Sequence, residues 1–358
     1  MIKYSIIGTG RISVNHIASV INNNKDLDFV AACDIIPENI DIALDKCGYS
    51  KAINKYTDYR EMIIKERPDL VAIATDSGIH AEIGLFCLEH DCNVIIEKPM
   101  AMSISDADLL IETARKHHKV LCACHQNRFN KSILAIRKAI ENNRFGQISH
   151  IAAHVRWNRG KEYYDQAKWR GKWESDGGCL MNQCIHNADL MQWMLGDIDE
   201  VFSYTDNKQH EYIEAEDLGL ALIKAKNGSY GLFEGTVNVY PKNLEETLYI
   251  FGGKGTVKAG GKSVNLIEEW DFADNCEEDK YIKENCKEVP KNVYGFGHSR
   301  LYEDVISAIK NGTEPLVNGE EGKKAVELIL AMYKSKKTGL PVKLPLNDFA
   351  SIDMKGSF

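Results

Sequence analysis

The chain has 358 residues and a mass of 40.3 kDa, and at about 100–200 residues per domain this length predicts two domains. Hydrophobic residues make up 44% and charged residues 27%, which is typical of a globular protein and excludes collagen-like and disordered chains. The 44 lysines and arginines are outnumbered by 52 aspartates and glutamates, and the net charge of -8 argues against nucleic acid or an anionic membrane as partner. No apolar run approaches the length of about 18 residues that a membrane-spanning helix needs.

The N-terminus and the cysteines indicate a cytoplasmic protein. The first apolar run is short and is interrupted by Gly8, unlike the apolar core of a secretory signal. The cysteines are scattered, and neither Cys122 and Cys124 nor Cys179 and Cys184 have a second pair at the spacing of a zinc site. We therefore expect reduced thiols and no metal.

Short apolar strands and helical segments alternate in the first third of the chain. The strands are expected at 4–7, 27–33, 70–74, 93–96 and 120–124, and the helices at 13–21, 37–47, 59–65, 80–89 and 105–117. Apolar strands separated by helices predict a parallel sheet that helices cover on both faces. The expected fold class is α/β, with a doubly wound Rossmann domain at the N-terminus.

The glycine loop between the first strand and the first helix has the features of a dinucleotide-binding turn. Gly8 permits the tight turn, and Gly10 lets the backbone approach a pyrophosphate. Ser13 is small enough for the helix and the strand to pack closely, and N–H groups at the helix N-terminus would hold the phosphates. Such turns also occur for structural reasons alone, but the position between a strand and a helix favours a dinucleotide.

Asp34 ends the second predicted strand and indicates which dinucleotide is bound. Its carboxylate can accept hydrogen bonds from the adenosine ribose hydroxyls and would repel a 2′-phosphate, which favours NAD over NADP. The alternative is that Asp34 caps the helix that follows at Pro37-Glu38.

After residue 124 the pattern changes to strands in which apolar and polar residues alternate. They are expected at 148–157, 218–226, 229–239 and 247–251, with helices at 299–310 and 322–336. Asn227-Gly228 lies between two of these strands and is a strong hairpin signal. We expect an α+β domain with a mostly antiparallel sheet, and domain boundaries of 1–124 for cofactor binding and 125–358 for substrate binding and oligomerisation. The C-terminal helices could pack back on the first domain.

A helix inserted among these strands carries polar groups. It is expected to begin near Gly177-Gly178 and to end at Gly196. Asn182 and His186 would lie one turn apart on one face, and Asp189 would follow within the next turn. A single helix histidine is more often structural, and only the glycines and the neighbouring Asn182 favour a functional site.

The turn Glu97-Lys98-Pro99 directly follows the strand at 93–96. The carboxyl ends of strands in a doubly wound sheet face the ligand, so Lys98 is expected beside the nicotinamide, where its ammonium could orient and polarise a substrate hydroxyl. Pro99 fixes the turn and would tolerate a cis peptide bond. The alternative is a surface lysine at a strand end.

Taken together, these motifs resemble the Gfo/Idh/MocA oxidoreductase family over nearly the whole chain. The resemblance is carried by the glycine loop, the Glu97-Lys98-Pro99 turn and the segment from Gly177 to Asp189. It implies that Lys98 and His186 flank the hydroxyl-bearing carbon of a sugar above the nicotinamide. Many members carry Asp where this chain has Asn182, so a Lys–Asp–His triad is not expected, and the proton transfer falls to His186 with Lys98.

Longer segments resemble a narrower group, the WlbA-type dehydrogenases of bacterial surface-polysaccharide synthesis. These segments are Met181-Asn182-Gln183 and residues 162–165, 168–174, 240–245 and 293–298. The resemblance implies NAD-dependent oxidation of the C3 hydroxyl of UDP-N-acetyl-2-amino-2-deoxy-D-glucuronate to a 3-keto sugar, which an aminotransferase then uses. Neutral His186 would take the hydroxyl proton, which suits a side chain whose ordinary pKa is about 6.5.

The resemblance also implies which residues contact the ligands. Cofactor contacts are expected from Gly8, Gly10, Arg11, Ile12, Asp34, Ile35, Thr75, Ser77, His80, Glu97, Lys98, Gln126, Trp169 and Arg170. Substrate contacts are expected from Lys98, Arg159, Tyr163, Tyr164, Asn182, Gln183 and His186. Cations for the diphosphate and the carboxylate are sought among Arg128, Arg156, Arg159, Lys168, Arg170 and Lys242, although each of these could be only a solvated charge. For His80 the alternative is a simple capping turn.

Two other functions fit the same motifs. One is a dehydrogenase of the same family that acts on inositol or another sugar, and the other is a non-catalytic sensor, which has no reason to keep both Lys98 and His186. The expected partners are a UDP-sugar and further copies of the chain in a homo-oligomer, a dimer or a tetramer. Neither nucleic acid nor a membrane is expected as a partner.

Overall fold

The computed structural model describes residues 1–274, 276–288 and 296–358, which form two compact units. The first unit consists of Met1–His125 and His298–Lys323, and the second of Gln126–Gly297 and Lys324–Phe358. Each unit is therefore made of two separate stretches of chain, whereas the expected domains were two continuous segments. Among the helices in the described ranges, none has both the length and the apolar character needed to cross a bilayer.

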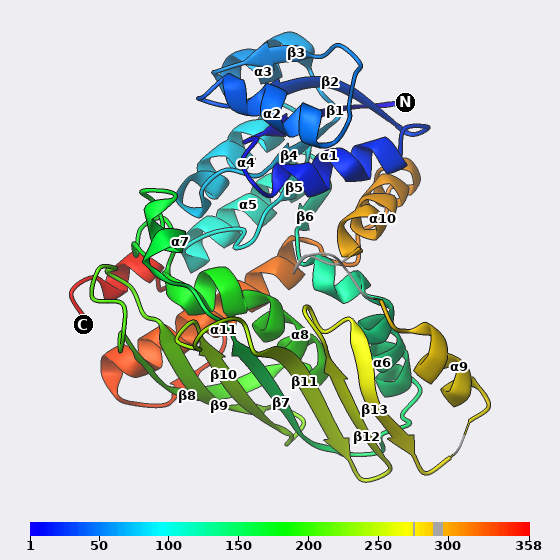
Figure 1. Cartoon of the computed structure of the whole chain (residues 1–358), viewed down its shortest axis with the longest axis vertical. Coiled ribbons are helices and arrows are strands. Elements are labelled where there is room, and N and C mark those ends of the chain that lie inside the picture. The colour runs from blue at the N-terminus through cyan, green and yellow to red at the C-terminus, as the bar shows by residue number, and fades with distance from the viewer. Residues whose placement is uncertain (275, 289–295) are drawn as a thin grey trace. The chain divides into compact units, whose positions relative to one another are not determined.

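The first unit is built on a six-stranded parallel sheet with the strand order β3-β2-β1-β4-β5-β6 (Figure 1). The strands are β1 (Ile2–Ile7), β2 (Leu27–Cys33), β3 (Asn54–Tyr56), β4 (Leu70–Ile73), β5 (Asn93–Ile96) and β6 (Leu121–Ala123). This is the order of a dinucleotide-binding Rossmann domain, and it confirms the expected doubly wound sheet. Every residue of β4 is buried, because a central parallel strand is covered on both faces.

Helices from two parts of the chain cover this sheet. They are α1 (Ser13–Asn22), α2 (Glu38–Lys46), α3 (Tyr59–Glu66), α4 (His80–Glu89) after the 3-10 turn η1 (Ser77–Ile79), α5 (Ile104–Lys116) and α10 (Gly297–Asn311). The Tyr302 hydroxyl of α10 lies 2.9 Å from that of Tyr4 in β1, and Lys310 forms an ion pair with Asp26. These contacts explain why α10, although distant in sequence, belongs to the first unit.

The second unit contains an eight-stranded sheet with the order β13-β12-β11-β7-β10-β9-β8-β14 (Figure 1). The strands are β7 (Ile148–Arg156), β8 (Ile198–Asp206), β9 (Leu218–Ala225), β10 (Tyr230–Thr236), β11 (Glu245–Gly252), β12 (Gly255–Gly260), β13 (Leu266–Phe272) and β14 (Val342–Lys343). All neighbours are antiparallel except β7 and β10, so the expected mostly antiparallel sheet is confirmed. Asn227-Gly228 forms the expected turn between β9 and β10.

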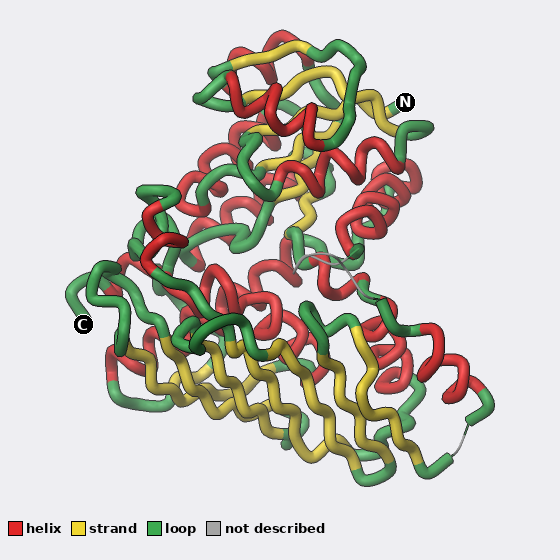
Figure 2. The backbone as a smooth tube through the Cα atoms, in the orientation of Figure 1, coloured by secondary structure: helices red, strands yellow, loops and turns green. Residues whose placement is uncertain are grey.

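The helices of this unit are η2 (Gln126–Phe129), α6 (Lys131–Glu141), α7 (Lys161–Asp165), the π-helix η3 (Leu180–Cys184), α8 (Ile185–Leu195), α9 (Glu278–Asn285), the part of α11 (Gly319–Thr338) that begins at Lys324, and the 3-10 turn η4 (Ser351–Met354). Helix α8 lies across one face of the sheet, against β7, β10 and β11 (Figure 2). Along β9 buried and exposed residues alternate, and Leu220 and Leu222 point to the exposed face. The sheet therefore has one covered face and one open apolar face.

Candidate active site

The glycine loop in the first unit combines a packed turn with an open backbone face. Gly8 has a φ of +87°, and a Cβ there would lie 2.6 Å from the carbonyl carbon and oxygen of Ala74 at the end of β4, so only glycine fits. Ser13 is buried, and its hydroxyl donates to the carbonyl of Gly10 at 2.7 Å. No described atom lies within 4 Å of a Cβ built on Gly10, so the backbone there is accessible, as a bound pyrophosphate requires. The side chain of Arg11 is exposed and that of Ile12 is half-buried.

Asp34 holds the glycine loop and the turn that follows it. One carboxylate oxygen accepts hydrogen bonds from the N–H and the hydroxyl of Thr9, at 2.8 and 2.9 Å. The other accepts from the N–H of Ile36 at 2.9 Å and from the Asn39 amide at 3.2 Å. These four bonds use about the full capacity of a carboxylate, so a ribose hydroxyl would have to share or replace one of them. Ile35 is exposed beside this carboxylate.

The loops after β4 and β5 are joined by His80, which is buried. Its Nδ1 lies 2.8 Å from the carbonyl oxygen of Pro99, and its Nε2 lies 3.3 Å from that of Thr75. Burial lowers the pKa of His80, so the imidazole is neutral and its one N–H serves the shorter contact to Pro99. His80 therefore links the two loops, and its contact with a cofactor stays a prediction, as does that of the buried Ser77.

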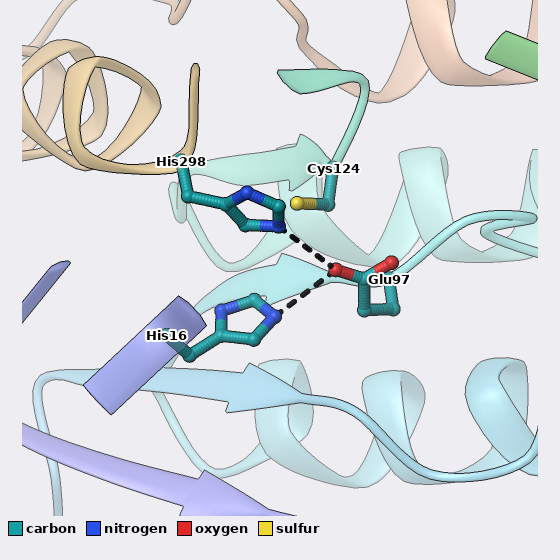
Figure 3. A group of neighbouring side chains, drawn as sticks. All are labelled: His16, Glu97, Cys124 and His298. Atoms are coloured by element: carbon teal, nitrogen blue, oxygen red, sulfur yellow. Dashed lines mark hydrogen bonds and ion pairs between the residues drawn. The ribbon is translucent and has the colours of Figure 1, made fainter. Parts of the chain in front are cut away.

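Lys98 is half-buried at the end of β5, and the Lys98–Pro99 peptide bond is cis, as the sequence allowed. The neighbouring Glu97 is buried, and its carboxylate faces the imidazoles of His16 and His298 (Figure 3). Sequence reasoning found Glu97, did not single out His16, and included His298 only as the last residue of the motif at 293–298, with no role at this site. The position of His16 on the buried face of the helix after the glycine loop was the available signal.

In the second unit, three of the predicted site residues gather around the side chain of Tyr163, itself a predicted site residue. The guanidinium carbons of Arg170 and Arg159 lie 4.0 and 5.1 Å from the ring centroid, at distances that allow cation–π attraction. The Gln183 amide donates to the Tyr163 hydroxyl at 3.0 Å, and Arg170 donates to the Tyr163 carbonyl at 2.5 Å. The arrangement offers two cations and an aromatic wall in one place, which suits an anionic ligand.

His210, which sequence reasoning did not identify, anchors the segment that carries Arg159. Its Nδ1 lies 2.8 Å from the Asp217 carboxylate and its Nε2 2.6 Å from the Arg159 carbonyl oxygen. Both partners accept hydrogen bonds at short distances, which favours protons on both ring nitrogens. Burial lowers the pKa of His210, but the hydrogen bonds to Asp217 and Arg159 outweigh it and raise the pKa above its ordinary value. Tyr164, expected at the substrate, is buried with its ring 5.6 Å from that of His210.

The helix that carries His186 differs from the regular α-helix that was expected. Residues Leu180–Cys184 form a π-helix, so the spacing of one α-helical turn between Asn182 and His186 does not hold. The Asn182 amide instead donates to the carboxylate of Asp176, which is buried. A carboxylate therefore still lies beside Asn182, although the chain has no Asp at that position. His186 is the second residue of α8 and is buried.

A buried carboxyl group supports the start of this helix. Glu216 accepts the N–H of Leu180 at 2.7 Å and lies 3.0 Å from the hydroxyl of Tyr333. Burial raises the pKa of Glu216 well above its usual range, so the group is held in its neutral form. A Cβ on Gly178 would lie 1.5 Å from this carboxyl group, which explains why glycine stands there.

Two of the arginines proposed for the diphosphate, Arg128 and Arg156, form ion pairs with carboxylates of the second unit. Arg128 is completely buried and donates to Asp189 at 2.8 and 2.6 Å, and Arg156 is paired with Glu234 and Glu245. The expectation that Arg128 is available to a ligand is therefore corrected, because its charge is used to neutralise a buried carboxylate.

The other predicted residues lie as follows. Lys168 and Lys242 are exposed, Trp169 is half-buried and Gln126 is buried. Of the motif at 293–298, residues 293–295 lie outside the described residues.

Comparison with known proteins identifies the family. The model of the oxidoreductase family's NAD-binding Rossmann fold matches residues 2–125, and the model of its C-terminal alpha/beta domain matches residues 137–344. The structure is similar to WlbA dehydrogenases from Bordetella pertussis and Chromobacterium violaceum in complex with NADH and UDP-GlcNAcA. Each is 35% identical to this chain, with a TM-score of 0.88. The match covers 97% of this chain in both cases, 98% of the Bordetella protein and 96% of the Chromobacterium protein. The sequence is also 25% identical to a myo-inositol 2-dehydrogenase of Thermotoga maritima, over 96% of this chain and 98% of that protein. The chain therefore belongs to the Gfo/Idh/MocA family of NAD-dependent oxidoreductases.

Proposed function

We propose that the protein oxidises the C3 hydroxyl of UDP-N-acetyl-2-amino-2-deoxy-D-glucuronate (UDP-GlcNAcA) with NAD. The observation that carries this proposal is the likeness, at 35% identity over 97% of the chain, to two WlbA dehydrogenases whose structures contain NADH and UDP-GlcNAcA. The cluster of Arg159, Tyr163 and Arg170 supports it, because it presents cations to a substrate with a diphosphate and a carboxylate.

In the proposed reaction, Lys98 and His186 both act on the substrate hydroxyl. Bound NAD would accept the hydride from C3. The imidazole of His186 takes the hydroxyl proton as general base, and the ammonium of Lys98 donates a hydrogen bond that orients the oxygen and stabilises its developing charge. Asn182 can hydrogen-bond the sugar but cannot take a proton, so the base is His186.

A cavity in the second unit is a candidate for the nucleotide part of the substrate. It has a volume of about 460 Å³, and its lining includes Trp157, Asn158, Lys242 and Lys262. An indole face and two ammonium groups suit a base and a diphosphate, although Glu246 in the same lining would repel an anion when ionised. Burial raises the pKa of Glu246 to about 8, so near neutral pH this carboxyl group is mostly uncharged.

The test is a spectrophotometric assay of NADH formation with NAD and UDP-GlcNAcA, and with UDP-N-acetylglucosamine as the control substrate. We expect turnover of the uronate, and a loss of at least about 100-fold in kcat for Lys98→Met and for His186→Asn. Lys161→Met, which removes an exposed lysine of the second unit, is the matched control and should keep its activity. Turnover of the control sugar alone would overturn the assignment of the uronate.

A second candidate function is oxidation of inositol or of a sugar without a nucleotide. The likeness to the myo-inositol 2-dehydrogenase over almost the whole chain favours it. Thermal unfolding with and without UDP separates the two candidates, because only a ligand that binds the folded protein raises its melting temperature. An increase with UDP supports the nucleotide sugar, and stabilisation by myo-inositol alone supports the alternative.

We also propose that the open face of the eight-stranded sheet binds a second copy of the chain. Tyr204, Leu222 and Leu232 are 66%, 62% and 45% exposed on adjacent strands, and Leu222 is the register partner of Leu232. A contiguous apolar face of this kind is typical of an oligomer interface. Light scattering after gel filtration should give a dimer or tetramer, which Leu222→Lys dissociates and Tyr281→Lys on α9 does not. A monomeric wild type would refute the proposal.

A further inference from the structure

Three buried side chains meet around the buried carboxylate of Glu97 in the first unit. His16 comes from α1, Cys124 from the segment after β6 and His298 from α10, and their polar atoms and those of Glu97 all lie within 4.8 Å of one another (Figure 3). Such a set of donors can hold a metal ion or can form a hydrogen-bonded network, and the distances distinguish the two.

The contact between His16 and Glu97 favours hydrogen bonding. The Nε2 of His16 lies 3.0 Å from Oε1 of Glu97, an ordinary hydrogen-bond length. Two ligands of one tetrahedral zinc ion, each about 2.0–2.2 Å from the metal, would lie about 3.3–3.5 Å apart. His298, whose Nε2 is 3.6 Å from the same oxygen, adds a longer polar contact.

One tautomer of His16 makes every contact in this network favourable. Its Nδ1 lies 2.8 Å from the hydroxyl of Tyr302, which in turn lies 2.9 Å from that of Tyr4. If Tyr302 donates to Nδ1, then Nε2 carries the proton and donates it to Glu97. The reverse tautomer would turn a lone pair towards the carboxylate. Burial acts to raise the pKa of Glu97, but the interactions with His16 and His298 outweigh it and hold the pKa well below its usual range. The carboxyl group is therefore an anion, which needs hydrogen-bond donors of this kind.

The carboxylate held by His16 is bonded to the backbone of the next residue. Its second oxygen, Oε2, accepts the N–H of Lys98 at 3.2 Å. On the other side of Lys98, His80 bonds to the carbonyl of Pro99 at 2.8 Å. The short turn from which the Lys98 side chain extends is thus held at both ends by buried histidines.

We propose that His16 is a positioning residue for Lys98: its imidazole fixes the Glu97 carboxylate, and the carboxylate fixes the peptide from which Lys98 extends. This inference rests on the proposed role of Lys98. Removing the imidazole leaves Oε1 of Glu97 with only the longer contact to His298, so the carboxylate can turn and the Lys98 ammonium is displaced from the position at which it meets the substrate. A displacement of about 1 Å at such a site lowers turnover by about 100-fold.

The test compares His16→Leu, which removes the donor, with His16→Gln, whose amide nitrogen can replace Nε2. His16→Leu should lower kcat for UDP-GlcNAcA by about 10–100-fold, with the KM for the sugar and the Kd for NADH changed less than about three-fold. His16→Gln should recover most of the loss. His90→Leu, at the exposed end of α4, is the control and should behave as the wild type. If His16→Leu fails to fold, Tyr302→Phe, which removes the partner of Nδ1, provides a milder second variant.

A second measurement does not depend on the substrate. In protein labelled with ¹⁵N-lysine, the amide resonance of Lys98, assigned with Lys98→Arg, should shift in His16→Leu and stay in place in His16→Gln and His90→Leu. If the wild type does not turn over the sugar, the proposed function fails, while this resonance still tests the positioning role.

Three results would overturn the inference. The first is a Lys98 resonance that does not move in His16→Leu. The second is an equal loss of kcat in the leucine and glutamine variants, which a merely structural role predicts. The third is one zinc ion per chain in the purified protein by elemental analysis, which would make the cluster a metal site.

Discussion

Replacing Arg128 by methionine should destabilise the second unit by about 3–5 kcal/mol. The side chains of Arg128 and Asp189 are 0% and 1% exposed, and the guanidinium donates to both carboxylate oxygens, at 2.8 and 2.6 Å. The substitution keeps much of the volume of the side chain but removes the charge that compensates for the burial of Asp189. The loss of free energy is mainly the cost of that carboxylate without its cation.

The assay is urea unfolding followed by tryptophan fluorescence. All five tryptophans belong to the second unit, so the signal reports on the unit that contains the substitution. Lys161→Met is the control. Lys161 and its partner Asp165 are both more than half exposed, and such an ion pair contributes only about 0.3–0.5 kcal/mol to the free energy of unfolding. Adding Asp189→Leu to Arg128→Met should recover most of the lost stability, since no buried charge then remains.

A different result would refute this reasoning. If Arg128→Met unfolds within about 1 kcal/mol of the wild type and instead raises the KM for the nucleotide sugar, Arg128 contacts the diphosphate, as the sequence had suggested. The buried ion pair would then not be the form of the protein that binds substrate.

Two further predictions concern the segments that carry the candidate site. Gly178→Ala should cost about 1–3 kcal/mol more than Gly196→Ala, because both residues have positive φ but only at Gly178 would the new Cβ meet Glu216, at 1.5 Å. Equal losses in urea unfolding would mean that the Glu216 side chain can move aside. The pKa of His210 is raised in the folded protein, so its bond to Asp217 stabilises the fold fully at a pH below the unfolded-state pKa of about 6.5. This stabilisation is lost as the pH rises through the pKa of His210 in the folded protein. The stability advantage of the wild type over His210→Gln should therefore shrink as the pH rises above about 6.5, and a constant difference would contradict a charged imidazole.

Most elements of the first unit could be predicted because their signals are local. Strands β2 and β5 have the expected bounds, and each is an apolar run bounded by polar residues. Strand β3 was missed because it has only three residues and none is buried, so it lacks the apolar run. In the second unit, β12 was not expected because it begins and ends with glycine, a residue typical of turns rather than strands.

The candidate site was partly predictable for the same reason. Gly8 and Lys98 follow β1 and β5, and the carboxyl ends of parallel strands lie on one edge of the sheet. The π-helix before His186 had no local signal, since its five residues would also fit an α-helix. The partner of Asn182 is Asp176, and periodicity does not reveal such a pairing.

Sequence alone determined most strands and helices of the first unit and the groups able to do chemistry, because periodicity, turn residues and strand ends are properties of short segments. Tertiary structure decided which of those groups are already engaged. His16 and Tyr302 are 286 residues apart, and Arg128 and Asp189 are 61 apart, so only folding brings them into contact. Burial then fixes their roles, since a charge or a polar hydrogen removed from water must find a partner within the fold.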